Sequence, residues 1–155
     1  MNSKKLISNG PKETEEMGKK LSNFILQLKE PGPCLIFLQG ELGTGKTTLT
    51  RGFVKGFGFK EMVKSPTYTI VELYSSPSIE IHHFDFYQIS HIKELSNIGI
   101  EEYLNKKDSI SIIEWPEKFM DFLPSPDVHI ILNHSTKKDE ERLLEVFSKI
   151  NLNLG

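Results

Sequence analysis

The sequence has few of the features that mark secreted or membrane-spanning proteins. Cys34 is its one cysteine, so no disulfide forms within the chain. No apolar run approaches the roughly 20 residues that cross a bilayer, and the first ten residues, MNSKKLISNG, lack the apolar stretch of a secretory signal. We therefore expect a cytoplasmic protein with no membrane partner, in which Cys34 is a small core residue and not a reactive thiol.

The charges nearly balance, and arginine is scarce. The formal net charge is −2, from 19 basic and 21 acidic residues, and the only arginines are Arg51 and Arg142. A domain that binds nucleic acid by itself usually carries a strong basic excess. We therefore expect any contact with nucleic acid to be indirect at most. The 155 residues suit a single domain, 1–155, with one core.

Apolar spacing predicts the helices. Residues 14–29 place their apolar side chains on one helical stripe, and Thr14 is the expected N-cap. A second helix is expected from residue 46 to about residue 56 or 58. Residues 90–106 predict short helices that are broken at Gly99.

Short apolar runs bounded by turn residues predict the strands. The expected strands are 34–39, 66–74, 79–87, 109–115 and 127–133. The SSPS sequence between the second and third of them predicts a hairpin. The apolar spacing of 141–149 suits either a helix or a strand, and we expect a strand because a short polar turn precedes it.

Residues 40–48, GELGTGKTT, contain a glycine, four further residues and then glycine-lysine-threonine, which is the P-loop pattern. Glycines let backbone N–H groups converge on phosphate oxygens, and the following helix points its positive end at the same anion. We expect Lys46 to bind the β and γ phosphates, Thr47 to ligate Mg²⁺ and Thr48 to bond a more distant phosphate. The other expected nucleotide contacts in the loop are Gly43, Thr44 and Gly45. The predicted fold is an α/β, P-loop NTPase-like three-layer domain with a mixed, partly antiparallel central sheet.

A P-loop NTPase also needs a carboxylate at the end of a neighbouring strand, which holds magnesium directly or through water. Asp85 follows the IEIHHF run, and Glu114 follows SISII. One acid is expected to serve the metal and the other the attacking water, and the sequence does not assign the two roles. With Lys46 they are the expected catalytic residues, and with Thr47 the expected metal ligands.

Two other polar segments near these motifs have competing interpretations. His82 and His83 precede Asp85, but neighbouring strand residues point to opposite faces, so we do not expect them to share a metal with it. Residues 105–108, NKKD, match the guanine-reading tetrapeptide of GTPases. The preceding EEYL is not a buried strand, so we expect a solvated turn there and adenine as the base.

Residues 65–67 are the expected switch-like segment. Pro66 holds Ser65 extended. The hydroxyl of Thr67 would then lie near the γ-phosphate, where the switch loops of NTPases sit. The alternative is an ordinary strand start that contains a proline.

Four motifs follow one another along the chain: GELGTGKTT, SPTYTIV, HFDFYQI and IIEWPE. Their order and spacing, from about Thr14 to Arg142, resemble the TsaE family of small bacterial ATPases, also called YjeE. The resemblance implies that the protein binds and hydrolyses ATP with Mg²⁺. It also implies that the protein works with the TsaB–TsaD complex in making threonylcarbamoyladenosine beside the tRNA anticodon, without performing the transfer itself.

The resemblance also implies roles for residues at matching positions. Asp85 resembles the Walker B acid, Glu114 resembles the second metal-site acid, and Trp115 accompanies Glu114 near the nucleotide. Thr14 matches a family threonine near the bound nucleotide.

One position departs from the family pattern. Gln88 stands where the family usually has arginine, which puts that contact in doubt. An arginine that completes the site in cis would be Arg51 or Arg142, and Arg142 is the better candidate. A partner could instead supply the arginine in trans.

The leading hypothesis is an ATPase, slow by itself, whose nucleotide state controls docking to the tRNA-modification complex. Two alternatives remain. One is a P-loop small-molecule kinase, which would need an arginine-rich lid and an acceptor pocket. The other is a nucleotide-dependent regulator without productive hydrolysis.

Overall fold

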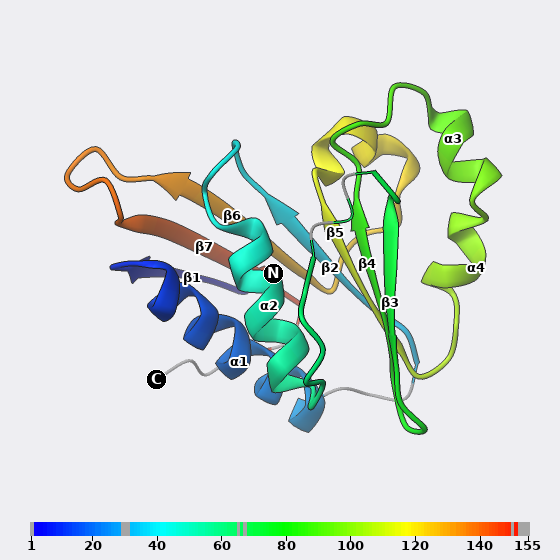
Figure 1. Cartoon of the computed structure of the whole chain (residues 1–155), viewed down its shortest axis with the longest axis horizontal. Helices are drawn as coiled ribbons and strands as arrows, with labels where there is room; N and C mark the ends of the chain where they lie inside the picture. Colours follow the sequence, from blue (N-terminus) through cyan, green and yellow to red (C-terminus); the bar gives the residue numbers. More distant parts are fainter. Residues whose placement is uncertain (1, 29–31, 65, 67, 150, 152–155) are drawn as a thin grey trace.

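The computed structural model describes residues 2–28, 32–64, 66, 68–149 and 151 (Figure 1). Its centre is a seven-stranded sheet with the order β1-β7-β6-β2-β5-β4-β3. The strands are β1 (Asn2–Ser8), β2 (Cys34–Gln39), β3 (Val71–Ser75), β4 (Glu80–Asp85), β5 (Ser109–Glu114), β6 (Val128–His134) and β7 (Arg142–Ser148). The helices are α1 (Pro11–Leu28), α2 (Lys46–Gly56), α3 (Ile92–Asn97), α4 (Ile100–Leu104) and the 3₁₀ helix η1 (Pro116–Phe122).

The sheet is parallel in its middle and antiparallel at both edges. Strand β2 pairs in parallel with β5 and β6, and β5 pairs in parallel with β4. Strands β3, β7 and β1 add antiparallel pairs outside this centre. The arrangement confirms the predicted α/β class with a mixed, partly antiparallel sheet. Because the central strands are parallel, the carboxyl ends of β2, β4 and β5 lie at the same end of the sheet.

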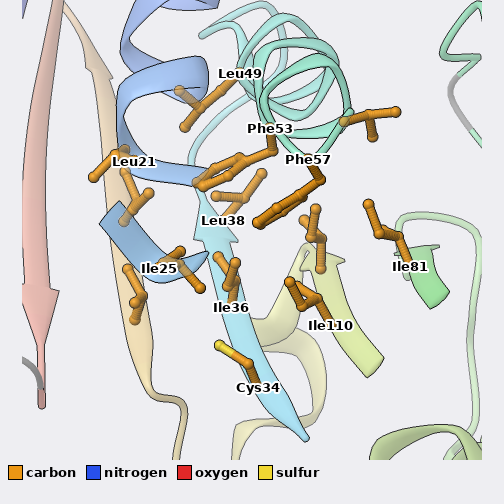
Figure 2. Close-up of a cluster of buried hydrophobic side chains, with 14 of the residues drawn as sticks. Leu21, Ile25, Cys34, Ile36, Leu38, Leu49, Phe53, Phe57, Ile81 and Ile110 are labelled. Carbon is orange, nitrogen blue, oxygen red and sulfur yellow. The ribbon is translucent and has the colours of Figure 1, made fainter. Parts of the chain in front are cut away.

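Helices α1 and α2 cover one face of the sheet. Figure 2 shows Ile36 and Leu38 of β2 beneath Leu21 of α1 and Phe53 of α2, all of them buried. Removing a side chain of this kind from water stabilises the fold by roughly 1.5–3 kcal/mol. This packing fixes α2, and so the loop before it, against the centre of the sheet.

Glycines allow α1 and α2 to pack with their backbones in close contact. A Cβ atom at Gly52 would lie 2.0 Å from the carbonyl oxygen of Glu15, and one at Gly18 would lie 2.4 Å from that of Leu49. Both distances are impossible for real atoms, so the contact requires glycine at these positions.

Helices α3, α4 and η1 belong to the other side of the sheet. Leu95 of α3, Ile100 of α4 and Phe119 of η1 share a second buried cluster with Phe37 of β2 and Phe84 of β4. Since Phe37 follows Ile36, the two clusters lie on opposite faces of β2. The three-layer arrangement was predicted from the sequence.

The structure confirms most predicted elements and corrects two of them. Helix α1 begins at Pro11, and Thr14 lies inside its first turns, so the prediction of Thr14 as N-cap is wrong. Proline suits the first helical position because its missing N–H has no partner there anyway. The strand predicted over 66–74 begins only at Val71, because Ile70 has a φ of 70°.

Two elements were not predicted, and one prediction cannot be compared. Strand β1 is mostly exposed and pairs with β7, far away in sequence. The 3₁₀ helix η1 is the other addition. Ser65 and Thr67 of the switch-like segment lie outside the described residues. Residues 105–108 form an exposed turn, as predicted.

Candidate functional site

The P-loop joins β2 to α2 and depends on glycine at three positions. Gly43 and Gly45 have φ values of 77° and 102°, in the left-handed region that favours glycine. A Cβ atom at Gly40 would lie 2.7 Å from the carbonyl oxygen of Leu132 and from Oγ1 of Thr44. Helix α2 begins directly after Gly45, so its first N–H groups are directed at the loop. This arrangement is a cradle for an anion.

Lys46 lies at the mouth of the loop and is 5% exposed. Its Nζ donates to the carbonyl oxygens of Gly40, at 2.5 Å, and Glu41, at 3.0 Å. Nζ also lies 4.2 Å from the centre of the Trp115 ring, a cation–π contact. Burial lowers the pKa of Lys46, and the carboxylates around it, Glu114 first, offset part of that effect.

Asp85 and Glu114 end neighbouring parallel strands. They are paired in the β4–β5 register and are 4% and 2% exposed. Oδ1 of Asp85 accepts a hydrogen bond from the backbone N–H of Tyr87, at 2.9 Å. Strand alternation places both acids on the α2 side of the sheet, the side of Ile81 and Ile112. Two buried carboxylates therefore stand side by side at the end of the sheet that faces the loop.

Glu114 is hydrogen-bonded to two other side chains. Oγ1 of Thr47 donates to Oε1 at 3.3 Å and lies 3.5 Å from Oε2. Nε2 of His83 lies 2.5 Å from Oε2. The first turn of α2 and the β4 strand thus both hold the carboxylate at the end of β5.

The sequence did not indicate His83 as a site residue. It is fully buried, and its other ring nitrogen, Nδ1, has no hydrogen-bond partner among the described residues. Leaving a buried polar group unpaired costs about 1–3 kcal/mol. His82, its neighbour, lies on the opposite face and contacts Glu80 and Ser111. The prediction that the two histidines point apart is correct, but His83 shares a face with Asp85.

Trp115 follows Glu114 in a left-handed conformation, with a φ of 62°. This conformation is uncommon for a bulky residue. It turns the chain from β5 into η1 and places the ring over Lys46 and 5.1 Å from the ring of Tyr87. Lys118 of η1 donates to the carbonyl oxygen of Tyr87 at 2.7 Å. The segments after β4 and β5 are thereby joined beside the loop.

The predicted residues meet around one cavity of about 310 Å³. Its lining combines the loop, the first turn of α2 and the ends of β4 and β5. The lining residues are Leu42, Gly43, Gly45, Lys46, Thr47, Thr48, Asp85, Tyr87, Glu114 and Trp115. The sequence did not indicate Leu42 or Tyr87, which belong to the site through the fold alone.

A second cavity, of about 260 Å³, lies beside the same loop and shares Gly43, Gly45 and Thr48 with the first. Thr14 and Arg142 line this second cavity. Thr14 is 2% exposed, and its hydroxyl is 2.6 Å from that of Ser8. The two predicted nucleotide contacts outside the main cavity therefore lie together.

Arg142 supports the loop and does not reach the acids' cavity. Its Nη2 donates to the carbonyl oxygen of Gly43 at 3.2 Å. Its register partner on β6 is His134. Nε2 of His134 lies 3.1 Å from the carbonyl oxygen of Leu42. The β6–β7 hairpin thus holds the tip of the loop. Gln88 is exposed.

The donor set suits a magnesium ion and a phosphate chain. Magnesium prefers hard oxygen ligands and retains several waters. Thr47, Asp85 and Glu114 offer a hydroxyl and two carboxylates in one cavity. The glycine-dependent loop and the start of α2 offer N–H groups, and Lys46 offers an ammonium group beside them.

The strand–loop–helix arrangement and the mixed sheet define this chain as a P-loop α/β protein. Its sequence matches the family model described as threonylcarbamoyl adenosine biosynthesis protein TsaE over residues 8–144. The chain belongs to the TsaE family, as the sequence motifs predicted.

Similar proteins agree with this assignment. The chain is 42% identical over 135 residues to the tRNA threonylcarbamoyladenosine biosynthesis protein TsaE of Haemophilus influenzae, covering 87% of this chain and 83% of that protein. It is 33% identical over 132 residues to the TsaE protein of Bacillus subtilis, covering 85% and 77%. The crystal structure of Bacillus subtilis YdiB superposes with a TM-score of 0.76 at 25% identity, covering 97% and 88%. No helix in the described part of the chain is long and apolar enough to cross a membrane.

Proposed function

We propose that this chain binds ATP with Mg²⁺ at the P-loop cavity, hydrolyses it, and thereby supports formation of threonylcarbamoyladenosine on tRNA together with the TsaB–TsaD complex. The observation that carries the proposal is that Lys46, Thr47, Asp85 and Glu114 line one cavity. Membership of the TsaE family supports the role in tRNA modification.

In this proposal the phosphate chain lies along the loop. The N–H groups at the start of α2 bind its oxygens, and Lys46 leaves the carbonyl oxygens of Gly40 and Glu41 to pair with the β and γ phosphates. The second cavity, lined by Thr14 and Arg142, takes the nucleoside end.

The three oxygen-bearing side chains account for metal binding and hydrolysis. Thr47, Asp85 and Glu114 would hold the metal ion directly or through water. A bound magnesium ion would neutralise charge that develops on the β and γ phosphate oxygens. The acid that does not ligate the metal directly orients the attacking water. Trp115 and Tyr87 line this end of the cavity, with their ring centres 5.1 Å apart.

Hydrolysis by the chain alone is proposed to be slow. Among the described residues, Arg142 is the only arginine that lines either cavity, and it lies at the cavity away from the acids. A transition-state arginine in the acids' cavity would then come from a partner. The described residues around the two cavities also lack the arginine-rich lid of a small-molecule kinase, so nothing favours that alternative.

The proposal is tested with the purified chain. We expect calorimetry to detect MgATP binding, and we expect phosphate release to accelerate when the TsaB–TsaD complex is added. Lys46→Ala should abolish binding, whereas Lys60→Ala, at an exposed lysine that lines neither cavity, should not. Absence of binding by the unaltered chain, or turnover that the complex leaves unchanged, would contradict the proposal.

A further inference from the structure

We infer that His83 is a positioning residue that orients the Glu114 carboxylate in the metal and water site, an inference that rests on the ATPase function proposed above. The His83 side chain is 0% exposed, and its Nε2 lies 2.5 Å from Oε2 of Glu114. The other carboxylate oxygen, Oε1, is the one nearer to Thr47. The two contacts together fix the rotation of the carboxylate.

The strand register determines how His83 reaches the site. It precedes Asp85 by two residues on β4, so both side chains lie on the same face. Its register partner on β5 is Ile112, two residues before Glu114. His83 therefore lies one step deeper along the strands than the two acids. It is not among the described residues that line the P-loop cavity, so it acts on the reaction through Glu114 only.

The hydrogen bonding of the ring indicates what this histidine contributes. Toward an ionised carboxylate, Nε2 of His83 acts as the donor. Nδ1 is a buried ring nitrogen with no partner among the described residues. An unpaired buried polar atom destabilises a fold, so packing alone would be better served by an apolar side chain here. The bond to Glu114 is the contact that a histidine makes here and an apolar residue does not.

Donors of this kind keep metal-ligating groups in the correct orientation. Loss of such a donor typically costs about 10–100-fold in metal affinity or activity. Here the Glu114 carboxylate would retain its contact with Thr47 and lose its support at Oε2. Binding of the phosphates by the loop and Lys46 does not depend on this support.

The chain contains a matched control at the next position. His82 is equally buried, at 0% exposure, but it lies on the other face and contacts Glu80 and Ser111. Replacing either histidine by leucine removes one buried imidazole. Only the change at residue 83 removes a donor to Glu114.

The experiment compares His83→Leu, His83→Gln and His82→Leu. We expect His83→Leu to lower kcat for ATP about 10–100-fold, with KM changed less than about twofold. The amide of His83→Gln reaches Oε2 and should restore most of kcat. His82→Leu should keep the kcat of the unaltered chain. In calorimetry, Mg²⁺ should strengthen ATP binding less in His83→Leu than in the unaltered chain, with equal ATP affinities in EDTA.

Each outcome decides the inference separately from the proposed function. If the unaltered chain binds or hydrolyses no ATP, the proposed function fails and the inference fails with it. If the unaltered chain is active, the inference alone would be overturned when His83→Leu has the same kcat and the same response to Mg²⁺ as the unaltered chain. It would also be overturned when His82→Leu loses as much kcat as His83→Leu. If His83→Leu does not fold, His83→Asn replaces it, since its shorter amide does not reach Oε2, and activity equal to that of His83→Gln would overturn the inference.

Discussion

Asp85 and Glu114 form the last register pair between β4 and β5, and both carboxylates are almost completely buried. Their strands run in parallel, so the two acids lie next to each other at the carboxyl ends of β4 and β5, on the face covered by α2. Thr47 and Glu114 are 67 positions apart in the sequence, yet Oγ1 of Thr47 lies 3.3 Å from Oε1 of Glu114. The sheet, and not proximity in sequence, brings the loop and the two acids together.

The first prediction concerns the charges of these two acids. Asp85→Asn and Glu114→Gln keep size and shape but weaken metal binding. We expect each to lower ATP hydrolysis by about 10²–10³-fold while ATP binding in EDTA is unchanged. Phosphate release and calorimetry measure the two effects, and Glu72→Gln, in the edge strand β3, is the control. If either variant retains the hydrolysis rate of the unaltered chain, the replaced acid has no role in the reaction.

The single tryptophan of the chain provides a spectroscopic prediction. Trp115 lies 4.2 Å from Nζ of Lys46, which is proposed to move toward phosphate when ATP binds. We therefore expect MgATP to change the intensity and wavelength of tryptophan emission. Lys46→Ala should change the emission of the free protein and abolish the response to MgATP. An emission spectrum that is unaffected by saturating MgATP would contradict the proposed movement.

A third prediction separates loop support from catalysis at Arg142. Its guanidinium group bonds the carbonyl oxygen of Gly43 and lines the cavity away from Asp85 and Glu114. A hydrogen bond to a charged group is worth about 1.5–3 kcal/mol. Because only part of this free energy should appear in the affinity for ATP, we expect Arg142→Ala to weaken ATP binding about 3–30-fold. The kcat should change less than about twofold. A much larger loss of kcat would instead identify Arg142 as an arginine finger acting in cis.

Local signals in the sequence predicted much of the site. The P-loop pattern located Lys46 and Thr47, and the ends of two apolar runs located Asp85 and Glu114. These predictions succeeded in placing the residues together because parallel strands end at one edge of a sheet, which follows from strand geometry. The catalytic roles themselves stay predictions.

Contacts between distant segments were not predictable in the same way. His83 is one of two adjacent histidines, and only the sheet register shows that it, and not His82, faces Glu114. Tyr87 reaches the cavity through a turn stabilised by Asp85. Strand β1 has little apolar pattern of its own and exists because β7 offers an edge to pair with. Such features depend on tertiary contacts and leave no periodic signal.

The fourth prediction concerns the close contact between α1 and α2. Gly52→Ala would place a methyl group 2.0 Å from the Glu15 carbonyl oxygen, so the helices must separate. We expect the free energy of unfolding to fall by about 3 kcal/mol or more, and the melting temperature by roughly 6–12 °C. Calorimetric or circular-dichroism melting measures the change. Asn23→Ala, on the exposed side of α1, is the control and should leave stability nearly unchanged; equal stability of Gly52→Ala would contradict the close contact.

The fifth prediction concerns pH and His129. Burial lowers the pKa of His129 below its ordinary 6.5, so the unfolded chain binds a proton more readily than the folded protein. The free energy of unfolding should therefore be highest above pH 6.5 and fall as the pH decreases toward 5. His129→Phe should reduce this decrease, because the group that titrates differently is gone. Urea unfolding at pH 5, 6, 7 and 8 measures the effect, and an unchanged pH dependence in the variant would contradict it.

The glycine contact between α1 and α2 also limits which parts of the protein respond to a nucleotide. At Gly18 and Gly52 the backbones of α1 and α2 are in close contact, which leaves α2 little room to move toward α1. We therefore expect the wall of the site that begins at Lys46 to move less than the rest of the site. Any movement that follows nucleotide binding is then expected in the opposite wall, where Trp115 leads into η1 and its exposed Phe122.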